Sequence, residues 1–381
     1  MKFLNDFLHL LRARLLGTPY FCHFYVTTHC DLKCKQCSFP DDFKRIDTLK
    51  KGNMNINEIN VLAERLKSIG VHNILLTGGE PFARGDLLDI VHLLIRKNFS
   101  VRVVTNGASL VTEERLREII DAGIDALQVS FDSISPEIHD EIAQQRGTWE
   151  KAKRTLEYAS AHLKDGMVCA LTVVSSMNIH ELSDIARYVT SIGAYSIFQP
   201  LHLSSAKNEI GMIGMSNYQE MRIRDEKNSI VEETYKKLLQ MKKEGYHILS
   251  SKRFLRDSID YFKTSKRRWN CDAYKYYLTI CPHGEVLPCL RYEDYEWLEH
   301  LNILDENFTK KYKNRAMQEN AEAYRKRCLG CVLSCYREMS YLLWSPSVFL
   351  ETANFIGRKY LRNFSQKFKS LSLCFNKHGF S

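Results

Sequence analysis

Short apolar runs alternate with stretches of helical periodicity through the first half of the chain. The apolar runs are His23–Thr27, Asn73–Thr77, Val101–Thr105, Ala126–Phe131, Val168–Val174 and Ser196–Leu201. The stretches between them, with apolar residues every three or four positions, are Ile56–Ser68, Leu87–Lys97, Glu113–Asp121, Trp149–His162 and His180–Ile192. The runs predict buried strands and the stretches predict amphipathic helices. Gly70, Gly123 and Gly193 directly follow three of these stretches, where a glycine commonly ends a helix.

A repeated unit of strand and helix predicts an α/β fold with a parallel sheet and its helices outside. Six units are too few to close an eight-stranded barrel, so we expect a partial (β/α)6 TIM-like barrel over residues 21–205. Residues 1–20 predict an N-terminal amphipathic helix. Residues 206–270 predict a helical connector that contains the amphipathic stretch Val231–Lys243.

The rest of the chain is rich first in cysteine and then in basic and aromatic residues. Residues 271–344 predict a small C-terminal cysteine-rich extension. In it, Tyr276–Ile280 and Glu285–Leu287 have the pattern of two strands joined by a Pro-His-Gly turn. Residues 345–381 form a basic aromatic C-terminal tail whose single acidic residue is Glu351.

Composition indicates a protein of a reducing compartment. The 381 residues are 44% hydrophobic, which is typical of a chain with a sizeable core. The N-terminus lacks the small-residue cleavage site of a secretory signal, and no apolar run approaches the roughly 18 residues of a membrane span. We therefore expect a cytoplasmic protein whose 12 cysteines serve metal binding rather than disulfides. The net charge of +9 is compatible with nucleic acid, an anionic membrane face or a lysine-rich surface.

Three cysteines near the start of the chain carry the strongest chemical signal. Cys30, Cys34 and Cys37 have the spacing C-x3-C-x2-C, which places three thiolates on one short loop. Such a loop suits three irons of a cubane iron–sulfur cluster and leaves the fourth iron open to a small molecule. A structural zinc site would need four ligands, and a disulfide knuckle is disfavoured in a chain with many reduced thiols.

A second motif, Leu-Leu-Thr-Gly-Gly-Glu-Pro, follows at Leu75–Pro81. By itself it predicts an ordinary turn from strand to helix, in which Gly78 and Gly79 allow the backbone to approach a ligand closely. Behind the cysteine triplet it is more specific, and together the two motifs resemble the radical S-adenosylmethionine (radical SAM) enzymes.

The resemblance implies that Cys30, Cys34 and Cys37 hold a catalytic 4Fe–4S cluster. It implies that the methionyl amino and carboxylate groups of S-adenosylmethionine chelate the open iron. Four residues are then expected along the amino group: Gly78, Gly79, Glu80 and Pro81. The family commonly has an aromatic residue just before the third cysteine, and this chain has Gln36 there.

Polar residues at the ends of later strands are expected on the same edge of the sheet, because active sites of parallel barrels collect at the carboxyl ends of the strands. In the resembled family such residues meet the ribose and amino acid parts of the cofactor, which implies this role for Ser130 and Asp132. Asn106 either hydrogen-bonds to cofactor or substrate or simply ends its strand in a turn. Gln199, at the end of the sixth strand, is expected to face adenine.

A second group of cysteines lies in the C-terminal extension. Cys271, Gly284 and Cys289 have the spacing C-x12-G-x4-C, and Cys328 and Cys331 form a C-x2-C pair. This pattern is similar to the SPASM or twitch extension of radical SAM enzymes. The similarity implies one auxiliary 4Fe–4S cluster held by Cys271, Cys289 and two of three further cysteines: Cys328, Cys331 and Cys335. Two complete clusters would also need Cys281 and Cys374, and a zinc knuckle is the alternative.

The resemblance implies an enzyme that reductively cleaves S-adenosylmethionine to a 5′-deoxyadenosyl radical, which abstracts hydrogen from a substrate C–H bond. The implied partners are a small electron-donor protein of the flavodoxin or ferredoxin type and a substrate, either a peptide or protein or a small molecule that is oxidised. Only 29 residues precede Cys30, which favours the peptide less because no N-terminal peptide-binding domain would fit there. A non-catalytic iron–sulfur or zinc protein that binds nucleic acid is the alternative, but it leaves the Gly-Gly-Glu-Pro motif unexplained.

Both ends of the chain have apolar residues beside basic ones. An apolar stripe at helical spacing comprises Phe3, Leu4, Phe7, Leu8, Leu11 and Leu15. With Arg12, Arg14 and the basic tail, it could lie in a membrane interface. The alternative, which we favour from the sequence, is that the helix packs on the barrel and closes its open bottom.

Overall fold

The computed structural model describes residues 2–37, 52–202, 218–223, 228–264, 269–287, 301–327, 331–354 and 357. Its centre is a single sheet with the strand order β6-β5-β4-β3-β2-β1-β7-β8-β9. The strands are β1 (Phe21–Thr27), β2 (Asn73–Gly78), β3 (Ser100–Thr105), β4 (Ala126–Ser130), β5 (Met167–Val174), β6 (Tyr195–Pro200), β7 (Tyr277–Ile280), β8 (Glu285–Leu287) and β9 (Leu301–Asn302). Neighbouring strands from β6 to β7 are parallel, and β8 and β9 run antiparallel to their neighbours.

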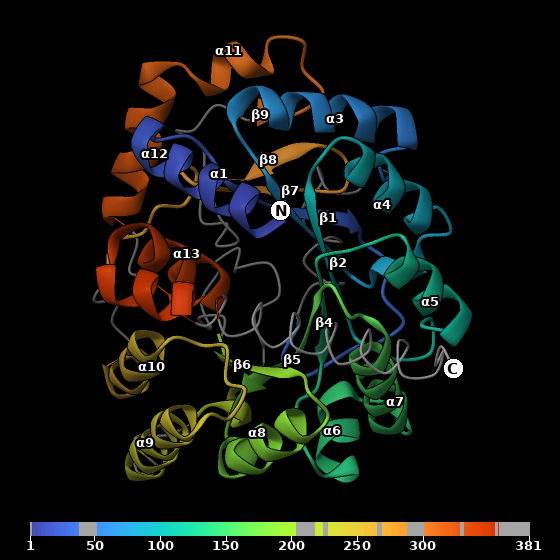
Figure 1. Cartoon of the computed structure of the whole chain (residues 1–381), viewed down its shortest axis with the longest axis vertical. Helices are drawn as coiled ribbons and strands as arrows, with labels where there is room; N and C mark the ends of the chain where they lie inside the picture. Colours follow the sequence, from blue (N-terminus) through green and yellow to red (C-terminus); the bar gives the residue numbers. More distant parts are fainter. Residues whose placement is uncertain are drawn as a thin grey trace, which may run out of the picture.

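Helices follow one another around the outside of the parallel strands (Figure 1). They are α3 (Ile56–Ile69), α4 (Leu87–Arg96), α5 (Glu113–Asp121), α6 (Pro136–Ala143), α7 (Thr148–His162) and α8 (Leu182–Ser191). The predicted α/β fold, a partial TIM-like barrel, is therefore confirmed. Gly70, Gly123 and Gly193 all have positive φ, as expected of glycines that end helices.

Further helices surround this core: α1 (Lys2–Leu16), α9 (Asn228–Glu244), α10 (Lys252–Thr264), α11 (Phe308–Tyr312), α12 (Arg315–Arg327) and α13 (Ser334–Trp344). The predicted stretch Val231–Lys243 lies within α9. The predicted hairpin is present as β7 and β8, with Gly284 at positive φ in its turn. No helix in the described part of the chain is long and apolar enough to cross a membrane.

Both edges of the six-stranded barrel sheet are extended by the C-terminal half of the chain. On one side β7 pairs in parallel with β1, with Phe21 opposite Tyr277 and Phe24 opposite Ile280. On the other side Ile248 bridges to Ser196 of β6. The hairpin of the cysteine-rich extension is thus part of the same sheet as the barrel.

The barrel contains a cavity at one of its ends. At the amino ends of the strands α13, α1 and residues 348–353 enclose a cavity of about 320 Å³. Its lining is mostly apolar and includes Leu10 of α1 and Phe21 of β1. The N-terminal helix lies on the barrel bottom as predicted, but the buried residues among its described side chains are Leu10 and Ala13, whereas Leu8 and Leu15 of the predicted apolar stripe are exposed.

Candidate active site

The cysteine loop follows β1 directly and lies against the end of β2. The N–H of Gly79 donates to the carbonyl of Thr27 at 2.9 Å, and the N–H of Glu80 donates to that of His29 at 2.8 Å. A Cβ added to Gly78 or Gly79 would overlap the carbonyl oxygen of Thr27 or His29, respectively. The two glycines are therefore needed so that the segment leading into the cysteines can pack on β2, a reason that the sequence alone did not indicate.

The Glu80 side chain points into the protein and connects two strand ends. Its carboxylate accepts hydrogen bonds from the Thr105 hydroxyl at 2.8 Å and from the N–H groups of Asn106 and Phe82 at 2.7 and 3.0 Å. Burial raises the pKa of this carboxyl to about 7. Glu80 thus fixes the Gly-Gly-Glu-Pro segment to the end of β3, and Pro81 starts the short helix η2 (Pro81–Ala83) beside it.

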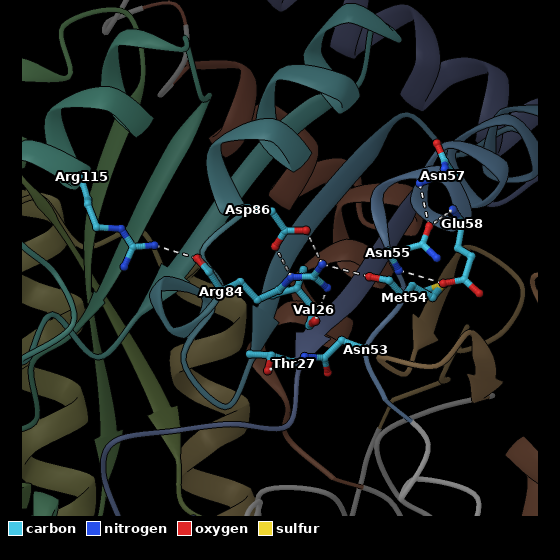
Figure 2. Close-up of polar contacts among 10 residues, drawn as sticks. All are labelled: Val26, Thr27, Asn53, Met54, Asn55, Asn57, Glu58, Arg84, Asp86 and Arg115. Atoms are coloured by element: carbon cyan, nitrogen blue, oxygen red, sulfur yellow. Dashed lines mark hydrogen bonds and ion pairs between the residues drawn. The ribbon is translucent and has the colours of Figure 1, made fainter.

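Arg84, just after this motif, holds the same region from the other side (Figure 2). Its buried guanidinium donates to the carbonyls of Val26 and Met54, both at 2.9 Å, and pairs with Asp86 at 2.7 Å. Arg115 of α5 in turn donates to the carbonyl of Arg84 at 2.7 Å. The carboxyl end of β1, from which the cysteine loop departs, is therefore held by a chain of charged groups.

Asn106 lies beside the first cysteine. Its amide N–H donates to the Asp31 carboxylate at 2.8 Å and lies 3.9 Å from the Cys30 sulfur. Its carbonyl oxygen accepts from the N–H of Ala108 at 2.8 Å. Asn106 therefore ends β3 and also positions the start of the cysteine loop, and its contact with cofactor or substrate stays a prediction.

Gln36 and Asp132 connect the cysteine loop to the end of β4. The Gln36 amide donates to the Asp132 carboxylate at 2.7 Å. The other carboxylate oxygen accepts from the Val173 N–H at 2.8 Å, and the Asp132 N–H donates to the imidazole of His139 at 3.2 Å. Burial raises the pKa of Asp132 to about 6. The residue before the third cysteine, Gln36, thus connects the cysteine loop to the end of β4 through a hydrogen bond.

Helix α6 supports the outer side of the cysteine loop. The Lys35 N–H donates to the Ile142 carbonyl at 2.8 Å, and its ammonium pairs with Glu141 at 2.8 Å. Leu32 packs with Ala108 and Ala143. These contacts were missed by the sequence analysis, which did not predict α6 as an element.

Burial affects the acidity of the cysteine-loop thiols. Burial raises the pKa of Cys30 to about 11. It raises the pKa of Cys34 well above its usual range, with further contributions from Cys37, Asp132 and Cys30. Thiols of this kind ionise when a metal binds and displaces the proton. Among the described residues no three His, Cys, Asp or Glu side chains stand close enough to hold a metal ion, so cluster binding by Cys30, Cys34 and Cys37 stays a prediction.

Ser130 and Gln199 lie apart from these contacts. Ser130 is the last residue of β4 and is partly buried. Gln199 lies in β6, and its amide donates to the carbonyls of Pro200 and Val332 and accepts from the Ser334 N–H at 2.6 Å. The side chain of Gln199 thus joins the barrel to α13, and its contact with adenine stays a prediction.

The second cysteine group is spread over several elements. Cys271 lies 3.4 Å from the Tyr277 hydroxyl, and the Cys331 carbonyl accepts from the Trp269 indole at 3.0 Å. Cys335 lines the cavity with three residues on the same face of α13: Glu338, Met339 and Leu342. Cys281 is fully buried. Cys289, Cys328 and Cys374 lie outside the described residues.

A buried arginine packs against the aromatic residues near Cys331. Arg337 of α13 pairs with Asp257 of α10, which also accepts from the Tyr341 hydroxyl. Its guanidinium lies 5.5 Å from the Trp269 ring centre and 5.2 Å from that of Tyr341. Burial lowers the pKa of this guanidinium, and the charge of Asp257, with smaller contributions from Glu338 and Cys331, opposes that shift.

Comparison with known proteins gives consistent results. Residues 24–189 match the family model described as "Radical SAM superfamily". The chain is 25% identical to PqqA peptide cyclase of Bradyrhizobium diazoefficiens over 280 residues, which cover 73% of this chain and 68% of the relative. It is 24% identical to the antilisterial bacteriocin subtilosin biosynthesis protein AlbA of Bacillus subtilis over 335 residues, 85% of this chain and 67% of the relative.

The fold is similar to that of Streptococcus suis SuiB, solved bound to its precursor peptide SuiA. The TM-score is 0.58 at 13% identity, and the match covers 84% of this chain and 71% of SuiB. This similarity supports the fold.

Proposed function

The chain belongs to the radical SAM superfamily of enzymes, and we propose that it modifies a peptide at an unactivated C–H bond. The observation that carries the proposal is the extent of its similarity to two proteins named for peptide chemistry, a peptide cyclase and a bacteriocin biosynthesis protein. These matches cover 73% and 85% of the chain and thus include more than the segment 24–189. The similarity to these two proteins therefore extends over the barrel and over the sequence beyond it, which supports a peptide substrate.

In this proposal Cys30, Cys34 and Cys37 would hold a 4Fe–4S cluster, beside which S-adenosylmethionine would bind. When bound, the two would supply the radical chemistry that removes a hydrogen atom from a substrate C–H bond. The contacts of the loop support its fitness to hold the cluster. Its position at neighbouring strand ends is fixed, directly or through one other residue, by Glu80, Arg84, Asn106 and Asp132. A rigid loop keeps the reacting groups in place.

The chain offers mainly hydrogen-bond acceptors to the cofactor. The N–H groups of Gly79 and Glu80 are both used on the cysteine loop, so this segment has carbonyl oxygens left for an ammonium group. Two buried oxygens on the loop, Oδ2 of Asp31 and Oε1 of Gln36, have no hydrogen-bond partner among the described residues. Amino and hydroxyl groups of a bound cofactor would satisfy such atoms. We assign Ser130 and Asp132, at the end of β4, to the same cofactor site.

The C-terminal extension is proposed to hold one auxiliary 4Fe–4S cluster through Cys271, Cys289, Cys328 and Cys331. Cys335 is the weaker candidate, because it faces the cavity with Glu338 and Met339 while Ser340, on another face of α13, is the residue near Tyr277 and Cys271. A small electron-donor protein of the flavodoxin or ferredoxin type is the proposed partner. A peripheral membrane contact is a further prediction and concerns the opposite end of the barrel.

The test is to incubate the anaerobically reconstituted full chain with S-adenosylmethionine, a reductant and short peptides encoded beside its gene. We expect one peptide to change mass in proportion to the 5′-deoxyadenosine formed, and the C30A/C34A/C37A variant to leave it unchanged. Formation of 5′-deoxyadenosine that responds to a small alcohol but to no peptide would contradict the peptide substrate and retain the enzyme class.

A further inference from the structure

The described side chains of helix α1, from Leu8 onward, form two apolar faces, of which one is buried in the molecule. Leu10 and Ala13 are buried against the barrel. Leu8, Leu15 and Leu16 lie on the exposed side, and Leu15 is 81% exposed. A helix that only closed the barrel would carry polar residues on that side.

The exposed leucines have apolar neighbours from the C-terminal part of the chain. Trp344, at the end of α13, is 49% exposed, and its ring lies 5.7 Å from the guanidinium carbon of Arg14 of α1. Leu350 is 61% exposed, and the residues just before it, Val348 and Phe349, line the same cavity as Leu10. We call these five residues the basal patch: Leu8, Leu15, Leu16, Trp344 and Leu350. In Figure 1 α1 lies beside α13, at the end of the barrel where the strands begin.

Basic residues accompany the basal patch, in α1 and in the sequence that follows it. Arg12 and Arg14 are exposed on α1. Among the described side chains, two acidic groups beside the patch have partners of their own, since Asp272 accepts from the Trp344 indole at 3.1 Å and Glu351 pairs with Lys242 at 3.2 Å. After Glu351 the sequence to residue 381 contains no acid and six basic residues: Arg358, Lys359, Arg362, Lys367, Lys369 and Lys377.

We infer that the basal patch docks on an anionic lipid bilayer. Leucines enter the acyl boundary, a tryptophan suits the interface, and arginines contact anionic head groups. Charge argues against two other occupants. The tail after residue 357 is as basic as the patch, and a second copy of the chain would place like charges against each other.

Docking of this kind leaves the active site accessible. The patch lies at the amino ends of the strands, where Tyr20 and Phe21 follow α1, whereas the cysteine loop follows the carboxyl end of β1. The seven residues of β1 separate the two ends by roughly 20 Å. The loop would therefore face away from the bilayer, toward its substrate and electron donor. The docking itself does not depend on the proposed peptide substrate.

Vesicle co-sedimentation of the full chain tests the inference. We expect binding to phosphatidylcholine vesicles that contain phosphatidylserine, little binding to phosphatidylcholine alone, and weaker binding as salt is raised. The variant L15E/L16E should bind at least about tenfold more weakly, because two leucines no longer enter the bilayer. Ile230→Glu, an exposed position on α9, is the matched control and should bind like the wild type. Thermal unfolding should be unchanged in all three proteins.

The remaining outcomes identify other occupants. Equal binding of L15E/L16E and wild type, or sedimentation that does not need phosphatidylserine, would overturn the inference. A wild-type dimer that L15E/L16E dissociates, without vesicle binding, would assign the patch to a second copy. A chain ending at residue 357 should bind more weakly and remain sensitive to L15E/L16E. Tighter binding of that shortened chain would mean that the tail covers the patch.

Discussion

The two groups of cysteines are positioned in contrasting ways. Cys30, Cys34 and Cys37 lie on one loop that is fixed by short polar contacts to the ends of β2, β3 and β4. Cys271 and Cys331 are about 60 residues apart and lie among aromatic side chains and one buried arginine. The first group needs only a local motif and a correct sheet edge, whereas the second depends on how distant helices pack.

This contrast suggests different sensitivities to mutation. The cysteine loop should fail through small displacements, because its backbone lies directly on that of Gly79. The second group should fail through loss of stability, because Arg337, Asp257 and Trp269 belong to the packed core around it. The first two of the following variants each affect one region and leave the other intact, and the third concerns the cavity beside α13.

The largest effect is expected from Gly79→Ala. The added methyl group would overlap the His29 carbonyl and press on the backbone of Cys30, so the cysteine loop must shift. We expect the rate of 5′-deoxyadenosine formation to fall by about 100-fold or more, since displacements of about 1 Å can have such an effect. Gly85→Ala is the matched control, because nothing lies within 4 Å of its added Cβ and its activity should be unchanged. Full activity of Gly79→Ala would contradict the tight packing of the loop.

A smaller effect, on stability, is expected from Arg337→Met. The change leaves Asp257 without its buried partner, which destabilises the folded state. Because Asp257 is partly exposed, the loss should be smaller than for a fully buried pair, about 2–4 kcal/mol in the free energy of unfolding. Denaturant unfolding measures this loss, and iron content should fall only at the C-terminal site. Arg315→Ala removes an exposed pair with Glu319 and should change stability by no more than about 0.5 kcal/mol. Equal effects of the two variants on the free energy of unfolding would show that Arg337 does not stabilise the fold more than an exposed arginine does.

The smallest effect concerns pH and Glu338, which lines the cavity beside Cys335. Burial raises the pKa of this carboxyl from 4.5 to about 7. Between these values the folded protein keeps a proton that the unfolded chain has released, so this group's contribution to stability falls as pH rises through the window. Glu338→Gln stays neutral and can still accept from the Ser251 N–H. The full shift corresponds to roughly 3 kcal/mol, and because the Glu338 side chain is only partly buried we expect Glu338→Gln to gain about 1–2 kcal/mol over the wild type as pH rises from 4.5 to 7. A difference that is constant or shrinks over this range would contradict the burial of Glu338.

The sequence predicted the repeated part of the fold well, because hydrophobic periodicity is a local signal. The strand at residues 73–77 was observed as Asn73–Gly78, and the helix Glu113–Asp121 was observed with those bounds. The pairing of β7 with β1 was not predicted, since strands more than 200 residues apart carry no local sign that they are neighbours. Helix α6 was also missed, because its eight residues are too few for a clear periodicity.

For the candidate site, the residue types were predictable and their partners were not. Glu80 was predicted from a motif to lie along a cofactor, and its carboxylate is used between β2 and β3. Gln36 departs from the resembled family, and only the structure reveals its hydrogen bond to Asp132. Partners of this kind come from strands that are distant in sequence, so they require the folded sheet edge.

The most direct test of the account compares cofactor cleavage in two variants that remove one cysteine group each. After anaerobic reconstitution with iron and sulfide, S-adenosylmethionine and a reductant are added, and 5′-deoxyadenosine and bound iron are measured. We predict that C30A/C34A/C37A forms no 5′-deoxyadenosine while keeping iron at the C-terminal site, and that C271A/C331A loses that iron yet still cleaves the cofactor. Cleavage that survives in C30A/C34A/C37A would contradict the assignment of the catalytic cluster to the loop after β1.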